Sequence, residues 1–194
     1  MSQERVSKEV HPAIEPRVIT RVLKDDGRFP NSHLPVLFYQ QAALAESLDP
    51  EHWEDLFRDN NWRGSWRDGI YNYHHYHSTS HEVLGAFRGA AKVQLGGDSG
   101  IIFDMRAGDV LVIPAGVAHK NLGATSDFGI VGAYPDARDW DLNYGKPGER
   151  PKTDEHIAKV PLPRNDPLYG PGGPLVKHWS LARKSFPSRT LFTD

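Results

Sequence analysis

The stretch from Gly69 to Tyr134 constrains the fold of this chain more than any other part of the sequence. It consists of short apolar or alternating runs, and each run is broken by Gly, Pro, Asp or Ser. Such runs predict β-strands joined by tight turns. Many short strands in succession are typical of a sandwich or barrel of antiparallel sheets, so the expected fold class is all-β. The candidate strands are Ile70–His77, Glu82–Arg88, Ala91–Leu95, Ile101–Phe103, Val110–Ile113, Ala118–Leu122 and Phe128–Tyr134.

The flanking segments add outer strands and little helix. Two strand-like stretches precede the core, at residues 18–23 and 34–40. Asp49 followed by Pro50 predicts the start of a short amphipathic helix, and a helical turn is indicated near Thr153, so one or two short helices are expected. We divide the chain into a polar N-terminal arm (1–16), a single domain (17–179) with its core at 69–134, and a C-terminal tail (180–194).

Composition excludes several classes of function. A chain of 194 residues suits one domain with its own core. Lys and Arg total 23 against 25 Asp and Glu, without a basic block, so nucleic acid is not an expected partner. The absence of Cys excludes disulfides and thiolate ligands and fits a reducing compartment. No apolar run suits a signal peptide or a membrane span. We therefore expect a cytoplasmic protein with no membrane partner.

The segment GIYNYHHYHSTSHEVLGAFRG, residues 69–89, contains the residues best suited to chemistry. If residues 70–77 form a strand, its side chains alternate between two faces, and His75 and His77 point the same way. Two imidazoles about 6.5–7 Å apart along a strand can converge on one ion at about 2.0–2.2 Å each. Glu82 follows after a turn, and a later segment supplies another imidazole. The predicted metal ligands are His75, His77, Glu82 and His119.

These segments resemble the two conserved motifs of the cupin superfamily. The first motif runs Gly, five residues, His-x-His, three or four residues, Glu, six residues, Gly, and its fixed positions are matched by Gly69, His75, His77, Glu82 and Gly89. The second motif is matched by Gly108, Pro114, Gly116 and His119. It departs from the family at Gly123, where cupins usually have Asn, which puts the turn-stabilising role of that Asn in doubt. Asn121 stands two residues after the histidine instead.

A wider resemblance extends over about residues 18–179. The stretches FRDNNWRGSWRDGIYNYHHYHS, VIPAGVAHKNLG and VGAYPDARDWDLNYGKPGERPKTDEHIAKVPLP are similar to the cupins grouped as YjlB-like. The resemblance implies a cupin jelly-roll barrel. It implies the fold far more strongly than a substrate.

Substrate-binding candidates follow from the same alternation of faces. Tyr71 and Tyr73 share the predicted face of His75, and Asn121 shares that of His119. Tyr134, at the end of the last core strand, is a further candidate for the wall of the site. Three apolar residues are expected to form its floor, namely Leu84, Phe87 and Phe103. Neither His74, on the opposite face, nor His81, in the turn, is a predicted ligand.

Three imidazoles and one carboxylate suit a divalent ion of Fe, Mn, Ni, Co or Zn and leave coordination positions for a small molecule. We expect a metal-dependent enzyme in which the ion is a Lewis acid or an O₂-binding centre. The resemblance implies oxygenase, isomerase, lyase or decarboxylase chemistry without choosing among them. The alternatives are a non-catalytic cupin that binds or senses a small ligand and, less favoured, an ion that only stabilises the barrel. A homodimer is expected from the resemblance and from the outer strands, which need partners.

Overall fold

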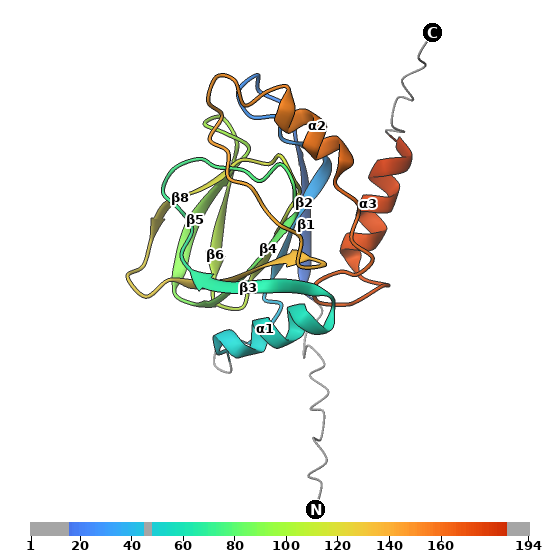
Figure 1. Cartoon of the computed structure of the whole chain (residues 1–194). Helices are drawn as coiled ribbons and strands as arrows, with labels where there is room; N and C mark the ends of the chain where they lie inside the picture. The colour runs from blue at the N-terminus through green and yellow to red at the C-terminus, as the bar shows by residue number, and fades with distance from the viewer. Residues whose placement is uncertain (1–15, 45–47, 186–194) are drawn as a thin grey trace, which may run out of the picture.

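Figure 1 shows the computed structural model of the chain, which describes residues 16–44 and 48–185. Residues 1–15 of the expected arm and 186–194 of the expected tail lie outside the described residues. The strands of the described part are β1 (Arg17–Leu23), β2 (Ser32–Gln40), β3 (Trp62–Asp68), β4 (Glu82–Arg88), β5 (Ala90–Leu95), β6 (Ile101–Arg106), β7 (Val110–Ile113), β8 (His119–Ala124) and β9 (Gly129–Pro135). The helices are α1 (Pro50–Asp59), α2 (Lys152–Lys159) and α3 (Pro174–Ser185).

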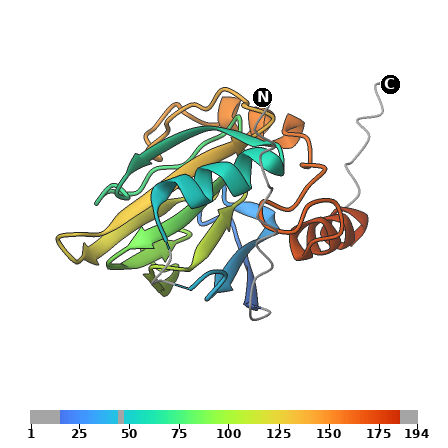
Figure 2. The ribbon, with the colours of Figure 1, turned by 90° about the horizontal axis from the view of Figure 1, so that it is seen from below.

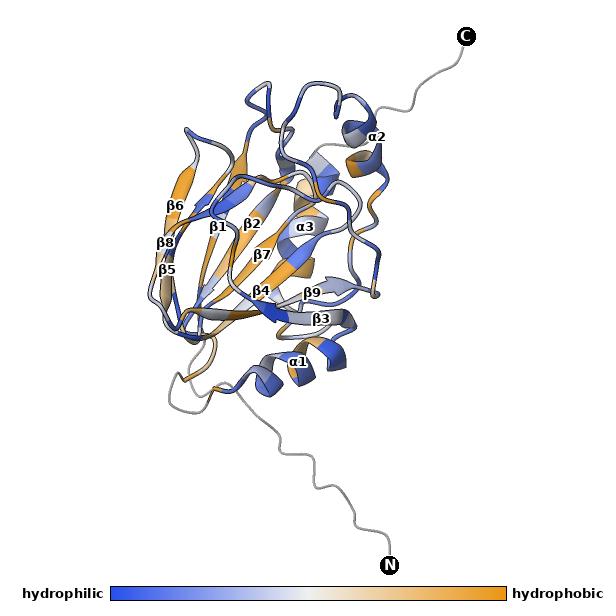
Figure 3. Cartoon of the chain, turned by 60° about the vertical axis from the view of Figure 1, so that its left-hand side comes forward, coloured by the Kyte–Doolittle hydropathy of each residue, from blue (hydrophilic) through white to orange (hydrophobic). Residues whose placement is uncertain are grey.

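The strands form two antiparallel sheets that enclose one apolar interior. The larger sheet has the order β1-β2-β7-β4-β9-β3, and the smaller has the order β6-β5-β8. Figure 3 shows the two sheets facing each other, with hydrophobic residues along their strands. Contact between Phe38 of β2 and Phe103 of β6, with ring centroids 4.7 Å apart, joins the sheets across this interior. The all-β jelly-roll class is confirmed.

A second apolar layer covers the outer face of the larger sheet. Along β4, Leu84 points into the space between the sheets, whereas Val83 packs into the outer layer. Trp53 of α1 and Trp179 of α3 are buried in that outer layer. Figure 2 shows α1 lying across the sheet and α3 beside it. Alternate residues of β4 therefore face two different apolar regions. One is the interior between the sheets, which can hold a site, and the other is an outer layer that stabilises the larger sheet.

The predicted strand at 70–77 is wrong. This segment is irregular apart from isolated bridges, which join His75 to His119 and Tyr76 to Asn143. Its aromatic and histidine residues have the composition of a strand, but the segment lacks a continuous partner. Conversely, the strand β3 was not predicted. Its sequence WRGSWRD is mostly exposed and contains Gly64, because β3 is an edge strand.

The helices agree only in part with the sequence analysis. α1 begins where predicted, and the side chain of Asp49 accepts a hydrogen bond from the His52 backbone nitrogen at 2.8 Å. The turn expected near Thr153 is the two-turn helix α2. The third helix, α3, was not expected, and it runs past residue 179. The Trp179 indole donates to the Pro35 carbonyl at 2.8 Å, which fixes α3 against β2. None of the helices within the described residues has the length and apolar character needed to cross a membrane.

Candidate metal centre

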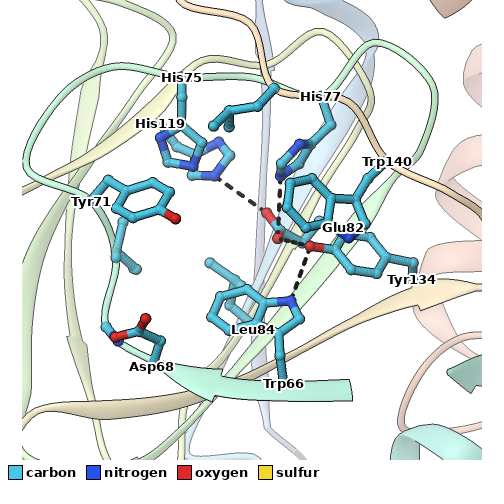
Figure 4. A pocket seen from close by; sticks show the side chains of 13 residues that line it. Trp66, Asp68, Tyr71, His75, His77, Glu82, Leu84, His119, Tyr134 and Trp140 are labelled. Atoms are coloured by element: carbon cyan, nitrogen blue, oxygen red, sulfur yellow. Dashed lines mark hydrogen bonds and ion pairs between the residues drawn. The ribbon is translucent and has the colours of Figure 1, made fainter. Parts of the chain in front are cut away.

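Side chains from separate parts of the sequence meet inside the barrel at one end of the sheets. His75 and His77 come from the irregular segment before β4, Glu82 is the first residue of β4, and His119 is the first residue of β8. The segments are held together by backbone hydrogen bonds, from His75 N to His119 O at 3.2 Å and from His119 N to His75 O at 2.9 Å. Figure 4 shows the three imidazoles grouped above the Glu82 carboxylate.

The distances are those of a group that can share one ion. One ring nitrogen from each of His75, His77 and His119 lies within 4.8 Å of the others. Glu82 Oε1 lies 3.4 Å from His77 Nε2, and Oε2 lies 3.3 Å from His119 Nε2. All four residues are buried. The structure thus brings together the four predicted ligands, including the two histidines whose predicted strand is absent.

Each imidazole is oriented by a backbone carbonyl. The Nδ1 atom of His75 lies 3.2 Å from the Tyr73 oxygen, that of His119 lies 3.2 Å from the Val117 oxygen, and that of His77 lies 2.5 Å from the Asp141 oxygen. Because a carbonyl can only accept, Nδ1 is the protonated donor in each case. The lone pair of the neutral ring is then on Nε2, which is the arrangement found around histidine metal ligands.

Electrostatics favour the metal-binding form at His75 and Glu82, but they favour the protonated ring at His77, whose proton a bound ion would have to displace. Burial lowers the pKa of His75 to about 3, so this ring is neutral at pH 7. Burial opposes the charge on His77, but the Glu82 carboxylate and the Asp141 carbonyl together raise the pKa of this ring. Burial also opposes the charge on Glu82, yet His77 and His119 hold its pKa below the usual range. Glu82 is therefore ionised, as a ligand must be.

A tyrosine and a tryptophan hold the Glu82 carboxylate in place. The Tyr134 hydroxyl donates to Glu82 Oε1 at 3.1 Å and accepts a hydrogen bond from Trp66 Nε1 at 2.9 Å. Glu82 Oε2 is buried and makes no hydrogen bond of good geometry. A buried carboxylate oxygen without a hydrogen bond is costly unless a cation balances it. This oxygen and the three Nε2 atoms fit a divalent transition-metal ion.

A cavity of about 110 Å³ lies beside this group. Its apolar wall is formed by Trp66, Ile70, Leu84, Trp140 and Leu142. The cavity is smaller than the roughly 300–1,000 Å³ typical of pockets for drug-sized ligands. It therefore suits a compact molecule.

The segment after β9 forms one side of the cavity and was missed by sequence reasoning. The Asp141 carboxylate accepts hydrogen bonds from the backbone nitrogens of Ser78 and Thr79, at 2.6 and 3.2 Å. Trp140 stacks on Tyr134, with centroids 5.8 Å apart and planes at 21°. A single sequence does not show this tertiary contact, although the stretch DARDWDLNYG is part of the wider resemblance.

The structure separates the predicted substrate-binding residues. Tyr71 and Tyr134 line the cavity. Tyr73 is not among the lining residues; it is 43% exposed and stacks on Tyr71 with centroids 4.9 Å apart. Asn121 does not line the cavity either, and its side-chain oxygen accepts from the Gly123 nitrogen at 2.7 Å, so it stabilises the local turn.

The expected floor is likewise only partly formed. Leu84 lines the cavity, whereas Phe103 packs on Phe38 deeper between the sheets. Phe87 packs in the outer layer, because its position on β4 has the parity of Val83. His74 turns away from the other histidines, and its ring packs on Phe29 with centroids 5.2 Å apart.

Comparison with known proteins identifies the family. No family model matches the chain. The uncharacterized protein YjlB of Bacillus subtilis is 41% identical over 165 residues, which cover 82% of this chain and 95% of that protein. The chain belongs to the YjlB-like cupins. The predicted membership of this family is confirmed.

Solved structures similar to this YjlB-like cupin are more distant. Pumpkin seed globulin is 28% identical with a TM-score of 0.34, over 41% of this chain and 22% of that one. Acireductone dioxygenase from Bacillus anthracis, with a cadmium ion in its active centre, is 14% identical with a TM-score of 0.36, over 67% of this chain and 84% of that one. Salicylate 1,2-dioxygenase from Pseudoaminobacter salicylatoxidans, in complex with gentisate, is 16% identical with a TM-score of 0.31, over 69% of this chain and 30% of that one.

Proposed function

We propose that this chain is a metal-dependent enzyme that acts on a small organic molecule in the cavity. A divalent ion of Fe, Mn, Ni, Co or Zn is held by His75, His77, Glu82 and His119. One observation carries the proposal: each of the three histidines donates Nδ1–H to a backbone carbonyl, so that Nε2 is the atom that can offer a lone pair to the ion when the ring is neutral. A bound ion of this kind supplies a Lewis acid or an O₂-binding centre, which serves oxygenase, isomerase, lyase or decarboxylase chemistry.

The protein's own residues prepare the site for such chemistry. The apolar wall, including Leu84, Trp140 and Leu142, excludes water from one side of the ligand group. A site with few waters strengthens electrostatic interactions inside it. Tyr134 and Trp66 fix Glu82, so the carboxylate does not have to reorganise when a substrate binds. Tyr71 presents its ring and hydroxyl to the cavity from the opposite side (Figure 4).

Metal analysis followed by a substrate screen tests the proposal. Protein purified without oxygen is analysed for bound metals, stripped with a chelator and reloaded with each of the five ions. Each form is then screened for O₂ consumption and for product formation by mass spectrometry. We expect one equivalent of metal and turnover that is lost in metal-free protein and in the variant His77→Ala. If the protein binds none of the five ions, the proposal is overturned.

The same screen distinguishes the alternative, a non-catalytic cupin that binds or senses a small ligand. That protein would bind metal and show ligand-dependent stabilisation without turnover of any bound molecule. The cavity wall is compatible with both functions. The full set of oriented ligands favours the enzyme, because a mere binding pocket for an apolar molecule has no need of four converging metal ligands.

The proposal includes a homodimer. β1 and β3 are the outer strands of the larger sheet, and β1 pairs only with β2 within the described residues. Val22 on β1 is 55% exposed. An unpaired strand edge with exposed apolar residues is a site for pairing with another chain. Light scattering at micromolar concentration is expected to give twice the chain mass, and a monomer mass would contradict the dimer.

A further inference from the structure

Apart from the histidines, the charged side chains that line the cavity are all acidic. Two acidic residues line it, Glu82 at the imidazole end and Asp68 at the end of β3. No Lys or Arg is among the lining residues of the described chain. Arg67, beside Asp68, is turned to the outer face, where it binds Glu54 at 2.6 Å and Glu51 at 2.8 Å. The protein therefore offers no cationic side chain to balance an anionic substituent on a bound molecule.

Asp68 is placed to contact a bound molecule. One of its carboxylate oxygens, Oδ1, accepts a hydrogen bond from the Gly69 nitrogen at 2.7 Å. The other oxygen has no protein partner within the described residues. Figure 4 shows the carboxylate below Tyr71, across the cavity from the histidines. A molecule bound at the ion would direct its far end toward this free oxygen.

The wall between these two ends suits a flat apolar body. Trp66 and Trp140 present indole rings to the cavity, and Leu84 and Leu142 complete the apolar contact. Aromatic side chains favour stacked or edge-on contact with planar groups. The cavity thus has chelation at one end, an apolar middle and a hydrogen-bond acceptor at the other end.

We infer that the cavity selects a compact, planar molecule that has a chelating pair of oxygens at one end and a hydrogen-bond-donating or cationic group at the other. Asp68 is the residue that sets this preference, and it discriminates against a carboxylate at the far end. The inference rests on the proposed function, because the chelating end requires the ion. It deepens that function by naming the substrate class.

Lys146, next to Tyr144, does not reverse this charge pattern. Lys146 lies over the ring of Tyr144, with its nitrogen 4.7 Å from the ring centroid. Tyr144 contacts Tyr73, with centroids 5.9 Å apart, and neither tyrosine lines the cavity. Lys146 is therefore separated from the cavity by these two rings. Its charge is also accessible to solvent and salt, which screen it.

Three catechols that differ only in the far substituent test the inference. Dopamine has an ammonium tail, 4-methylcatechol is neutral, and 3,4-dihydroxyphenylacetate has a carboxylate tail. Each is titrated under argon into protein loaded with Co(II), and binding is followed by visible absorption. The proteins are the wild type, Asp68→Asn, and the control Asp104→Asn, which removes an equal charge at the Lys92 ion pair on β6. Thermal melts check that all three are folded.

We expect the wild type to bind dopamine most tightly and 3,4-dihydroxyphenylacetate about tenfold more weakly, the size expected for one charge contact near a protein surface. Asp68→Asn should reduce this ratio to about twofold, whereas Asp104→Asn should retain it. Equal affinities in the wild type, or an unchanged ratio in Asp68→Asn, would overturn the inference and leave the proposed function standing. No spectral change with any catechol would overturn the inference alone, whereas protein that takes up neither Co(II) nor any of the other four ions would overturn the proposed function as well.

Discussion

Two buried histidine environments lie on opposite sides of the larger sheet. His75 lies inside the barrel and His81 lies in the outer layer, where its ring packs on Trp179 with centroids 4.5 Å apart. Burial lowers the pKa of both to about 3. They differ at Nδ1, which donates to the Tyr73 carbonyl in His75 but accepts from the Ala115 nitrogen, at 2.9 Å, in His81.

This difference separates a candidate ligand from a structural histidine. In His81 the lone pair of Nδ1 is already used, and Nε2 carries the proton. In His75 the lone pair of Nε2 remains available inside the cavity. Burial and lowered pKa are the same in both, so neither identifies a metal ligand. The role of Nδ1 in its hydrogen bond does separate the two, because only His75 has an Nε2 lone pair available for an ion.

The largest expected effect is the loss of metal in His119→Ala. The change leaves two imidazoles and Glu82, and we expect the affinity to fall by more than about a hundredfold, because loss of even an outer hydrogen-bond partner costs about 10–100-fold. A competition titration against a chelator measures the affinity. His74→Ala should bind metal as the wild type does, because the His74 ring packs on Phe29 away from the cavity. Equal losses in the two variants would contradict the separation of the two faces.

A smaller effect is expected from Tyr134→Phe. This change removes the hydrogen bond to Glu82 Oε1 and leaves Trp66 Nε1 without its acceptor. Glu82 then has more freedom, and we expect metal affinity to fall about tenfold. Isothermal titration with Zn(II) measures the change. Tyr73→Phe is the matched control, since Tyr73 is half-exposed and does not line the cavity. Unchanged affinity in Tyr134→Phe would show that Glu82 is held adequately without the hydroxyl.

The grouping of the candidate ligands His75, His77 and Glu82 could be predicted because their spacing is local. His75 and His77 still point to one side although no strand forms there, since the bridge between His75 and His119 keeps the backbone extended at that point. Glu82 was predicted for the same reason, as the first residue of a strand with clear alternation. The side on which residues two apart in sequence lie can therefore be predicted correctly even where the secondary structure is predicted wrongly.

The walls of the cavity could not be predicted in the same way. Trp66 lies on a strand whose polar sequence gives no periodic signal, and Trp140 lies on a segment that the Ser78 turn holds through Asp141. These placements depend on contacts between residues far apart in the sequence. Likewise, residues 180–185 of α3 were assigned to the tail because the sequence from His178 onward is basic and polar, although Leu175 and Trp179 bury one face of this helix. Helical periodicity in a short segment after a Gly- and Pro-rich stretch is a weak signal.

The smallest expected effect concerns pH and tests the structural role of His81. Below a pH of about 6.5 the unfolded chain protonates this histidine, whereas the folded chain keeps it neutral down to about pH 3. The unfolded state then binds more protons, so stability falls as the pH decreases through this window. His81 alone should lower the free energy of unfolding by about 0.7 kcal/mol between pH 7 and pH 6.

Urea unfolding of metal-free protein at both pH values measures this loss of stability, and His81→Gln should reduce the loss by that amount. The control His178→Gln, on the exposed side of α3, should leave it unchanged. The residual pH dependence in His81→Gln should include the contribution of His75, which binding of one equivalent of Zn(II) alters. If His81→Gln loses as much stability between pH 7 and pH 6 as the wild type does, His81 is not held neutral in the outer layer. His81 could then no longer serve as the structural histidine with which His75 is compared.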